Sequence, residues 1–148
     1  MQLPISTSTN NVFSPAIYLF PVNDTWAPKC VAEQHTRIGR QTSTRTVPTE
    51  QNGIFSSKVL SRRHAEVWQE NGKIYLKDTE SANGTFINGH RLSGESLESE
   101  PFELKNEDVI DFGIDVVGDD KKTIIHRKIS ARVFIPAGDK EDVFLSRL

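Results

Sequence analysis

Four Asn-Gly dipeptides divide this chain into short segments, and they constrain its fold more than any other feature. Asn-Gly favours a turn with positive φ at both central residues, which is the turn that closes two-residue β-hairpins. The clearest of the four is Asn71-Gly72, which separates the runs 64–69 and 73–78. Apolar and polar residues alternate in both runs, as expected for strands with one buried face. The sequence therefore predicts a hairpin here.

Further short apolar or alternating runs predict more strands, and no window combines a 3.6-residue apolar period with helix caps. They are 16–20, 36–39, 84–87, 91–92, 109–112 and a long last strand with Ile125, Ile129, Ala131, Val133 and Ile135 on one face. Many short strands joined by turns are typical of a sandwich or barrel. We expect an all-β fold, a β-sandwich of two antiparallel sheets. Two long loops are expected, 41–57 and 93–101.

The chain has 148 residues, which fits one domain. We expect a flexible N-terminal segment at 1–15, the folded domain at 16–138 and a C-terminal extension at 139–148. The single cysteine, Cys30, cannot form an intramolecular disulfide, which suits a reducing compartment such as the cytoplasm. No apolar run in the sequence is long enough to span a membrane.

Charge and composition exclude several classes of partner. The net charge of −2 argues against a general binder of nucleic acid or membrane surfaces, which needs an excess of Lys and Arg. The four histidines have no metal-ligand spacing, and one cysteine cannot build a zinc site. No glycine-rich nucleotide loop is present. We therefore expect no metal, no cofactor, no nucleic acid and no small-molecule substrate, so any anion site must be local.

Three motifs at the ends of predicted strands carry groups that bind anions. They are Ile38-Gly39-Arg40, the Ser-Arg-Arg-His run 61–64 and the glycine-rich run 81–89. Loops at one end of a sandwich can converge on one point. Converging loops would offer arginines, a serine hydroxyl, an asparagine amide and glycine-rich backbone. These groups match a phosphate, which carries roughly −1.5 to −2 charges and accepts bidentate bonds from arginine.

In this order the three motifs resemble the signature of the forkhead-associated (FHA) domain family, over roughly 17–135. The resemblance implies an FHA-like sandwich whose long loops, at one end, bind a phosphothreonine peptide without catalysis. By position it implies that Arg40 contacts the phosphate and that Ser61 donates its hydroxyl to it. Arg62 would hold the phosphate or nearby peptide backbone, and Asn83 would hydrogen-bond the peptide main chain.

The resemblance also implies structural roles for Gly39, His64 and Gly84, which would hold the loops in shape. Two positions depart from the family pattern. Ala82 stands where many members have Ser or Thr, which removes one possible phosphate donor, and its neighbour Ser81 is expected to point the other way. Glu107-Asp108 stands where Gly-Asp is typical, which we interpret as a turn variation away from the site.

Longer blocks at 58–65, 78–92 and 112–116 resemble the sarcolemmal-membrane-associated protein subgroup and its fungal relatives. That resemblance implies a longer protein with coiled coils and a C-terminal membrane anchor, at the cytosolic face of the endoplasmic reticulum or nuclear envelope. It also implies work within striatin-interacting phosphatase and kinase (STRIPAK) complexes, where the domain would recruit phosphorylated signalling partners.

Two other interpretations stay open at the level of sequence. One is a phosphate-independent interaction scaffold, in which the fold is kept and the site is degraded at Ala82. The other is an enzyme that uses Ser61 and His64. A serine hydrolase needs a G-x-S-x-G nucleophile elbow, and the closest imitation, 94–98, lacks the last glycine. We therefore expect a binding module and no enzyme.

Overall fold

The structure is a computed structural model that describes residues 16–31 and 35–136. The expected domain, 16–138, falls almost entirely within these ranges. The expected segments 1–15 and 139–148 lie outside the described residues. No helix occurs in the described ranges, and hence none there is long and apolar enough to cross a membrane.

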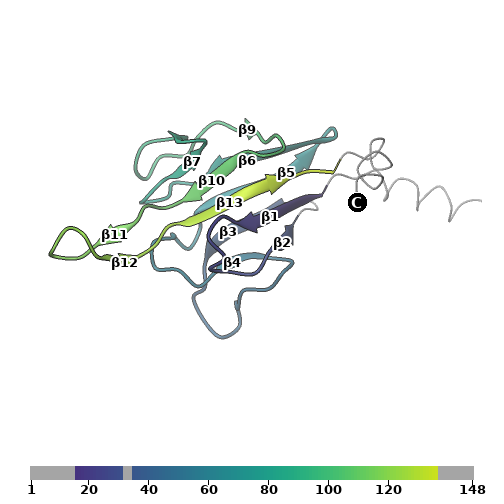
Figure 1. The fold of residues 1–148 in the computed structure, drawn as a ribbon. Helices are drawn as coiled ribbons and strands as arrows, with labels where there is room; N and C mark the ends of the chain where they lie inside the picture. The colour runs from purple at the N-terminus through teal and green to yellow at the C-terminus, as the bar shows by residue number, and fades with distance from the viewer. Residues whose placement is uncertain (1–15, 32–34, 137–148) are drawn as a thin grey trace, which may run out of the picture.

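The described residues form short strands arranged in three sheets (Figure 1). The strands are β1 (Ile17–Pro21), β2 (Lys29–Val31), β3 (His35–Arg40), β4 (Gly53–Phe55), β5 (Ala65–Glu70), β6 (Lys73–Asp78), β7 (Thr85–Ile87), β8 (His90–Arg91), β9 (Phe102–Glu103), β10 (Val109–Phe112), β11 (Val116–Val117), β12 (Ile124–His126) and β13 (Ile129–Phe134). One sheet has the order β2-β1-β13-β10-β7-β8 and a second has the order β4-β3-β5-β6-β9. Strands β11 and β12 pair only with each other, in a hairpin that we call the arm (114–128).

The all-β sandwich is confirmed, and its core lies between the two large sheets. Inward-facing residues alternate along the strands, as Ile17 and Leu19 do in β1 and Ile74 and Leu76 do in β6. Phe112, from β10, is among the largest fully buried side chains. Burial of these apolar surfaces is what stabilises a sandwich of two sheets.

One strand pair differs from the expected antiparallel pattern: β3 and β4 run parallel to each other. Gly39 of β3 lies opposite Ile54 of β4. Parallel neighbours need a long connection that returns the chain in the same direction, and the segment 41–52 provides it. The expected loop 41–57 therefore contains a short strand at the edge of the second sheet.

The predicted Asn71-Gly72 turn is confirmed, and Asn88-Gly89 forms a turn of the same kind. Asn71 and Gly72 both have positive φ, 54° and 78°, and they close the β5–β6 hairpin. Asn88 and Gly89, with φ of 51° and 89°, close β7 onto β8 in the same way. The pair at 52–53 makes no such turn, because its glycine begins β4.

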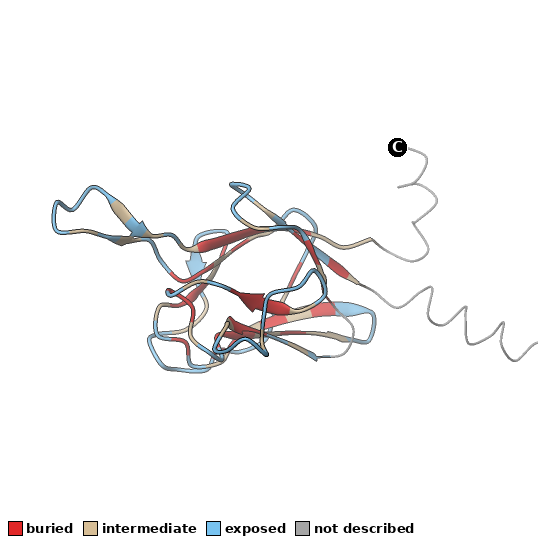
Figure 2. Ribbon diagram, turned by 90° about the horizontal axis from the view of Figure 1, so that it is seen from below, coloured by how far each residue is buried: buried red, intermediate tan, exposed pale blue. Residues whose placement is uncertain are grey.

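The predicted long last strand is wrong at its start. Strand β13 begins at Ile129, while Ile125 belongs to β12 in the arm and is 57% exposed. The chain leaves the large sheet between these strands, where the backbone N–H of Lys128 donates to the Asp115 carboxylate instead of joining a ladder. The arm projects from the sandwich and contains no buried residue (Figure 2).

The Glu107-Asp108 departure lies in a turn between β9 and β10. Glu107 has a φ of 74°, the left-handed conformation that favours glycine, which explains the family preference at this position. Asp108 stabilises the turn by accepting a bond from the backbone N–H of Lys105 at 2.8 Å. Neither residue lines the hollows described below.

Candidate functional site

The three motifs converge at one end of the sandwich, as the sequence predicted. The end of β3, the segment between β4 and β5 and the loop between β6 and β7 surround a hollow of about 740 Å³, which we call the basic hollow. Arg40, Ser61, Arg62 and Asn83 all line it. The structure therefore brings together the four side chains that the sequence singled out.

The basic hollow carries far more positive than negative charge. Its cationic residues are Arg37, Arg40, Lys58, Arg62 and Arg63. Glu80 is the one carboxylate among the described residues that line it. None of the five cations has an ion-pair partner within the described part of the chain. In a chain of net charge −2, this concentrates positive potential at one place and favours an anion there.

The sequence predicted no role for three of these cations. Arg37 and Lys58 were not singled out, and Arg63 was included only as a member of the run 61–64. Arg63 is exposed and lines the hollow as well. Their positions next to the first and second motifs were the available signal.

Gly39 lets the first two motifs touch. The backbone N–H of Arg40 donates to the Ser61 carbonyl at 3.1 Å, so the end of β3 lies against the second motif. A Cβ atom at Gly39 would lie 1.9 Å from the Arg62 carbonyl oxygen. Only a residue without a side chain fits where the two segments cross, which explains structurally why glycine occupies position 39.

His64 connects the second motif to the third. Its side chain is fully buried, its Nδ1 accepts from the Ser61 backbone N–H at 3.0 Å, and its Nε2 lies 2.8 Å from the Gly84 carbonyl. These partners require a neutral ring with the proton on Nε2. Both nitrogens are thus used by backbone groups, so His64 is not placed as a base for the Ser61 hydroxyl.

The buried state of His64 makes stability depend on pH. Burial lowers the pKa of His64 below its usual value of 6.5, against the opposing effect of the bond to Gly84. Between the lowered pKa and 6.5 the unfolded chain binds more protons than the folded one, so stability falls as pH falls through this window. We expect a lower melting temperature at about pH 5.5 than at about pH 7.5.

The variant His64→Gln should be less stable at neutral pH, and it should lose the part of the slope that this ring contributes. The exposed His90 offers a matched control, and His90→Gln should keep the wild-type slope. Thermal melts of the three proteins across this pH range make the comparison. Identical slopes for wild type and His64→Gln would contradict the assignment.

The Ser61 hydroxyl is positioned by the third motif. The backbone N–H of Ala82 donates to Ser61 Oγ at 3.1 Å, so the oxygen is held while its own proton remains able to donate elsewhere. Ser81 cannot serve as an extra donor, because it is fully buried and its hydroxyl donates to the Asp78 carboxylate. The expectation that Ser81 points away from Ala82 therefore agrees with the structure.

Asp78, which the sequence analysis did not single out, holds the third motif in place through hydrogen bonds to its carboxylate. It is buried, and its carboxylate accepts from the Ser81 backbone N–H at 2.8 Å, from the Ser81 hydroxyl and from the Thr85 hydroxyl at 2.7 Å. A fully bonded polar network of this kind holds a loop in one conformation. Asp three residues before Ser was the local signal for it, because Asp bonds readily to nearby backbone.

Asn83 and Gly84 complete the site. The Asn83 amide nitrogen donates to the Val59 carbonyl at 2.9 Å, which ties the third motif to the segment just before the second motif. Its amide oxygen has no partner among the described residues and remains available. Gly84 has a φ of 94°, in the left-handed region that favours glycine. A Cβ there would lie 2.8 Å from Arg91 Nε, at the end of a flexible side chain that can move aside.

The sequence matches one family model and several known proteins. The family model of the FHA domain matches residues 36–113. An uncharacterized protein of Schizosaccharomyces pombe is 42% identical over 127 residues, which cover 82% of this chain and 42% of that protein. Sarcolemmal membrane-associated protein of Homo sapiens is 44% identical over 110 residues, covering 72% of this chain and 13% of that protein. The chain thus spans less than half the length of these relatives.

Solved structures share the fold. One is the N-terminal FHA domain of Saccharomyces cerevisiae Rad53p in complex with a phosphothreonine peptide. Its TM-score is 0.59 at 17% identity, and the match covers 90% of this chain and 99% of that one. At this level of sequence identity the structural similarity shows a shared fold and nothing further.

Proposed function

Because this chain belongs to the FHA domain family, we propose that it is a phosphothreonine-peptide recognition module and not an enzyme. One observation carries the proposal. Five cations without ion-pair partners among the described residues line the same hollow as Ser61, a serine whose oxygen accepts from a backbone N–H and whose own proton is unused. Such a cluster of donors matches the charge and the three acceptor oxygens of a phosphate.

Each residue has a distinct part in the proposed contact. Arg40 and Arg62 supply charge and parallel N–H donors, which bind phosphate oxygens bidentately. The Ser61 hydroxyl donates a further short bond to the phosphate. Asn83 uses its free amide oxygen for an N–H of the peptide main chain, while its nitrogen stays on Val59.

The loops that hold these groups are connected to one another by contacts within the protein. Gly39 allows β3 to lie against the second motif, and His64 links the second motif to the third. Asp78 accepts hydrogen bonds from the third motif and fixes its conformation. A preformed site loses little conformational freedom on binding, which favours affinity. These contacts support a site whose shape is held by the protein itself.

At the level of the whole protein, we infer recruitment of phosphorylated signalling partners within a kinase and phosphatase scaffold complex. The resemblance to sarcolemmal membrane-associated protein supports this, as does its 44% identity to this chain. By the same resemblance, the longer protein is anchored in a membrane through a segment outside this chain. The domain would then face the cytoplasm, at the endoplasmic reticulum or nuclear envelope.

Ala82 offers a gain-of-function test. Its side chain is exposed and lines the basic hollow beside Ser61, at the position where many family members carry a hydroxyl. We expect Ala82→Ser to raise the affinity for a phosphothreonine peptide about three- to tenfold, since one hydrogen bond to a charged group contributes about 1 kcal/mol or more. Isothermal titration with Ala82→Val as a control checks this, and an equal or weaker affinity for Ala82→Ser would count against it.

The proposal is tested by titrating one peptide library in three forms, with phosphothreonine, phosphoserine or threonine at the central position. We expect selective binding of the phosphothreonine form. Equal binding of phosphorylated and unphosphorylated forms would overturn the proposal. A partner that binds wild type and Arg40→Ala equally well would favour the alternative of a phosphate-independent scaffold.

A further inference from the structure

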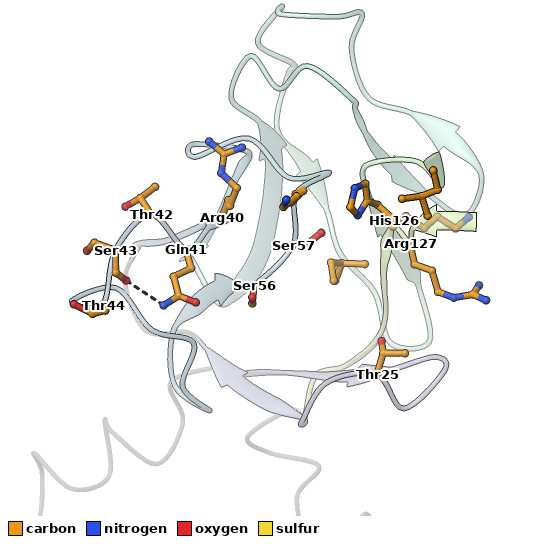
Figure 3. Close-up of a pocket in the computed structure, with 14 residues that line it drawn as sticks. Thr25, Arg40, Gln41, Thr42, Ser43, Thr44, Ser56, Ser57, His126 and Arg127 are labelled. Carbon is orange, nitrogen blue, oxygen red and sulfur yellow. Dashed lines mark hydrogen bonds between the residues drawn. The ribbon is translucent and has the colours of Figure 1, made fainter. Parts of the chain in front are cut away.

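A second, larger hollow opens beside the basic hollow, and we call it the arm hollow. It encloses about 1120 Å³ between the loop that follows β3, the segment 56–58 and the segment 125–129 at the base of the arm (Figure 3). Arg40, Thr42 and Lys58 line both hollows. The two hollows are therefore contiguous, and Arg40 stands on their shared wall.

The chemistry of the arm hollow favours an anion. No carboxylate belongs to the described residues that line it. Hydroxyl groups are abundant in its lining, from Thr25, Thr42, Ser43, Thr44, Ser56 and Ser57. Arg40 and Lys58 supply positive charge, and Figure 3 shows His126 across the hollow from Arg40.

The other cations of the lining contribute less. The Lys128 ammonium lies 3.2 Å from the Asp111 carboxylate, so its charge is largely neutralised. The Arg127 side chain points away from the hollow and adds only to the potential around its rim (Figure 3). Asp115 is also near, where it accepts from the backbone of Lys128. The balance inside the hollow still favours a negatively charged occupant.

At least one hydroxyl of the lining is prepared to donate. Ser57 Oγ accepts from the Val59 backbone N–H at 3.3 Å, which leaves the proton of that hydroxyl unused. This repeats the arrangement at Ser61, whose oxygen is likewise held by a backbone N–H. Two hydroxyls of this kind, one in each hollow, lie on either side of Lys58 in the sequence.

We propose that the arm hollow binds a second phosphate, carried by another phosphorylated residue of the same partner peptide. The inference rests on the proposed function, because the first phosphate must anchor the peptide beside Arg40. An extended peptide advances about 3.3 Å per residue, so moving the second phosphate one residue at a time along the peptide samples the span from Arg40 into the adjoining hollow. Once the first phosphate is bound, the second meets its site at a high effective concentration.

The test uses a binding peptide with phosphothreonine in the centre and a second phosphoserine placed at successive positions on either side. We expect one placement to bind about tenfold more tightly than the singly phosphorylated peptide, as a charge-assisted contact would give. Glutamate at that placement should give a smaller gain. A glutamate gain equal to that of phosphate would overturn the specific claim for a phosphate.

The variant His126→Glu puts a carboxylate on the wall of the arm hollow and leaves the basic hollow unchanged. We expect it to abolish the gain from the second phosphate while keeping the affinity for the singly phosphorylated peptide, which also shows that the variant is folded. Ser57→Ala should reduce the gain in part. His90→Glu, the same change on β8 away from both hollows, should leave the gain intact.

The outcomes separate the two proposals. A gain that survives in His126→Glu overturns the inference, because the second phosphate would then bind elsewhere. Absence of a gain at every placement, with normal binding of the single phosphothreonine, overturns the inference and leaves the proposed function standing. Failure of every phosphorylated peptide to bind overturns both.

Discussion

Replacing Arg40 with alanine is expected to lower the affinity for a phosphothreonine peptide at least about thirtyfold, or about 2 kcal/mol. Arg40 lines both hollows and has no ion-pair partner among the described residues, so its charge is available to a ligand. For the same reason, its loss leaves no buried carboxylate unpaired, and the free energy of unfolding should change by less than about 0.5 kcal/mol. Calorimetric titration and chemical denaturation measure the two effects separately.

Two further variants sharpen this result. Arg40→Lys keeps the charge but loses the planar fork of donors, so its affinity should lie between those of wild type and Arg40→Ala. Lys73→Ala removes one positive charge at the opposite end of β6 from the basic hollow, and it should bind like wild type. Equal losses for Lys73→Ala and Arg40→Ala would mean that net charge alone drives binding. No loss for Arg40→Ala would contradict the proposed role of this residue.

The variant Gly39→Ala is expected to be the most destabilising single-methyl change in the site, by about 3 kcal/mol or more. The added Cβ would lie 1.9 Å from the Arg62 carbonyl oxygen and 2.8 Å from the carbonyl carbon of that residue, both rigid backbone atoms. Relief requires β3 and the second motif to separate, which breaks the bond between the Arg40 N–H and the Ser61 carbonyl. Binding should therefore weaken together with stability.

Gly94→Ala is the matched control for this change. A Cβ at Gly94 would meet only Leu97 Cδ1, at 3.5 Å, which is an ordinary van der Waals contact. Gly94 does not have positive φ, so alanine fits its backbone, and stability should change by less than about 1 kcal/mol. Urea denaturation of the three proteins makes the comparison. If Gly39→Ala and Gly94→Ala were equally stable, the close crossing of β3 and the second motif would be wrong.

The features that sequence predicted well are those that local chemistry decides. The Asn71-Gly72 hairpin follows from a dipeptide that tolerates positive φ, flanked by alternating runs. The convergence of the three motifs follows from the sandwich architecture, which places strand ends together. For these features a short window of sequence contains the physical cause.

The features that escaped prediction depend on long-range pairing. Strand β4 is three residues long and buried throughout, so it shows no alternation, and it lies in a stretch rich in Ser, Thr and Pro. Ile125 has the same parity as the residues of β13, but the chain leaves the sheet before Ile129. The alternation of apolar residues can therefore continue along the sequence past the point where the strand ends.

The site was likewise predicted only in part. The residues of the motifs could be named, but the full set of five cations that line the basic hollow could not. Lys58, for example, reaches the hollow only because of the way the segment between β4 and β5 folds. The buried Asp78 network was invisible for a similar reason, since its partners come from the loop that it supports. The arm hollow depends on the segment 125–129, which lies outside all three motifs.

The most direct test of the account is the crystal structure of this domain with a phosphothreonine peptide. We expect the phosphate in the basic hollow, with one oxygen about 2.6–2.9 Å from Ser61 Oγ and another within hydrogen-bond distance of the Arg40 guanidinium. The Ala82 N–H should also donate to Ser61 Oγ in that complex, as it does in the structure described above. A phosphate bound away from Arg40 and Ser61, or exposed to solvent while the peptide is held by other contacts, would rule out the proposed phosphate site.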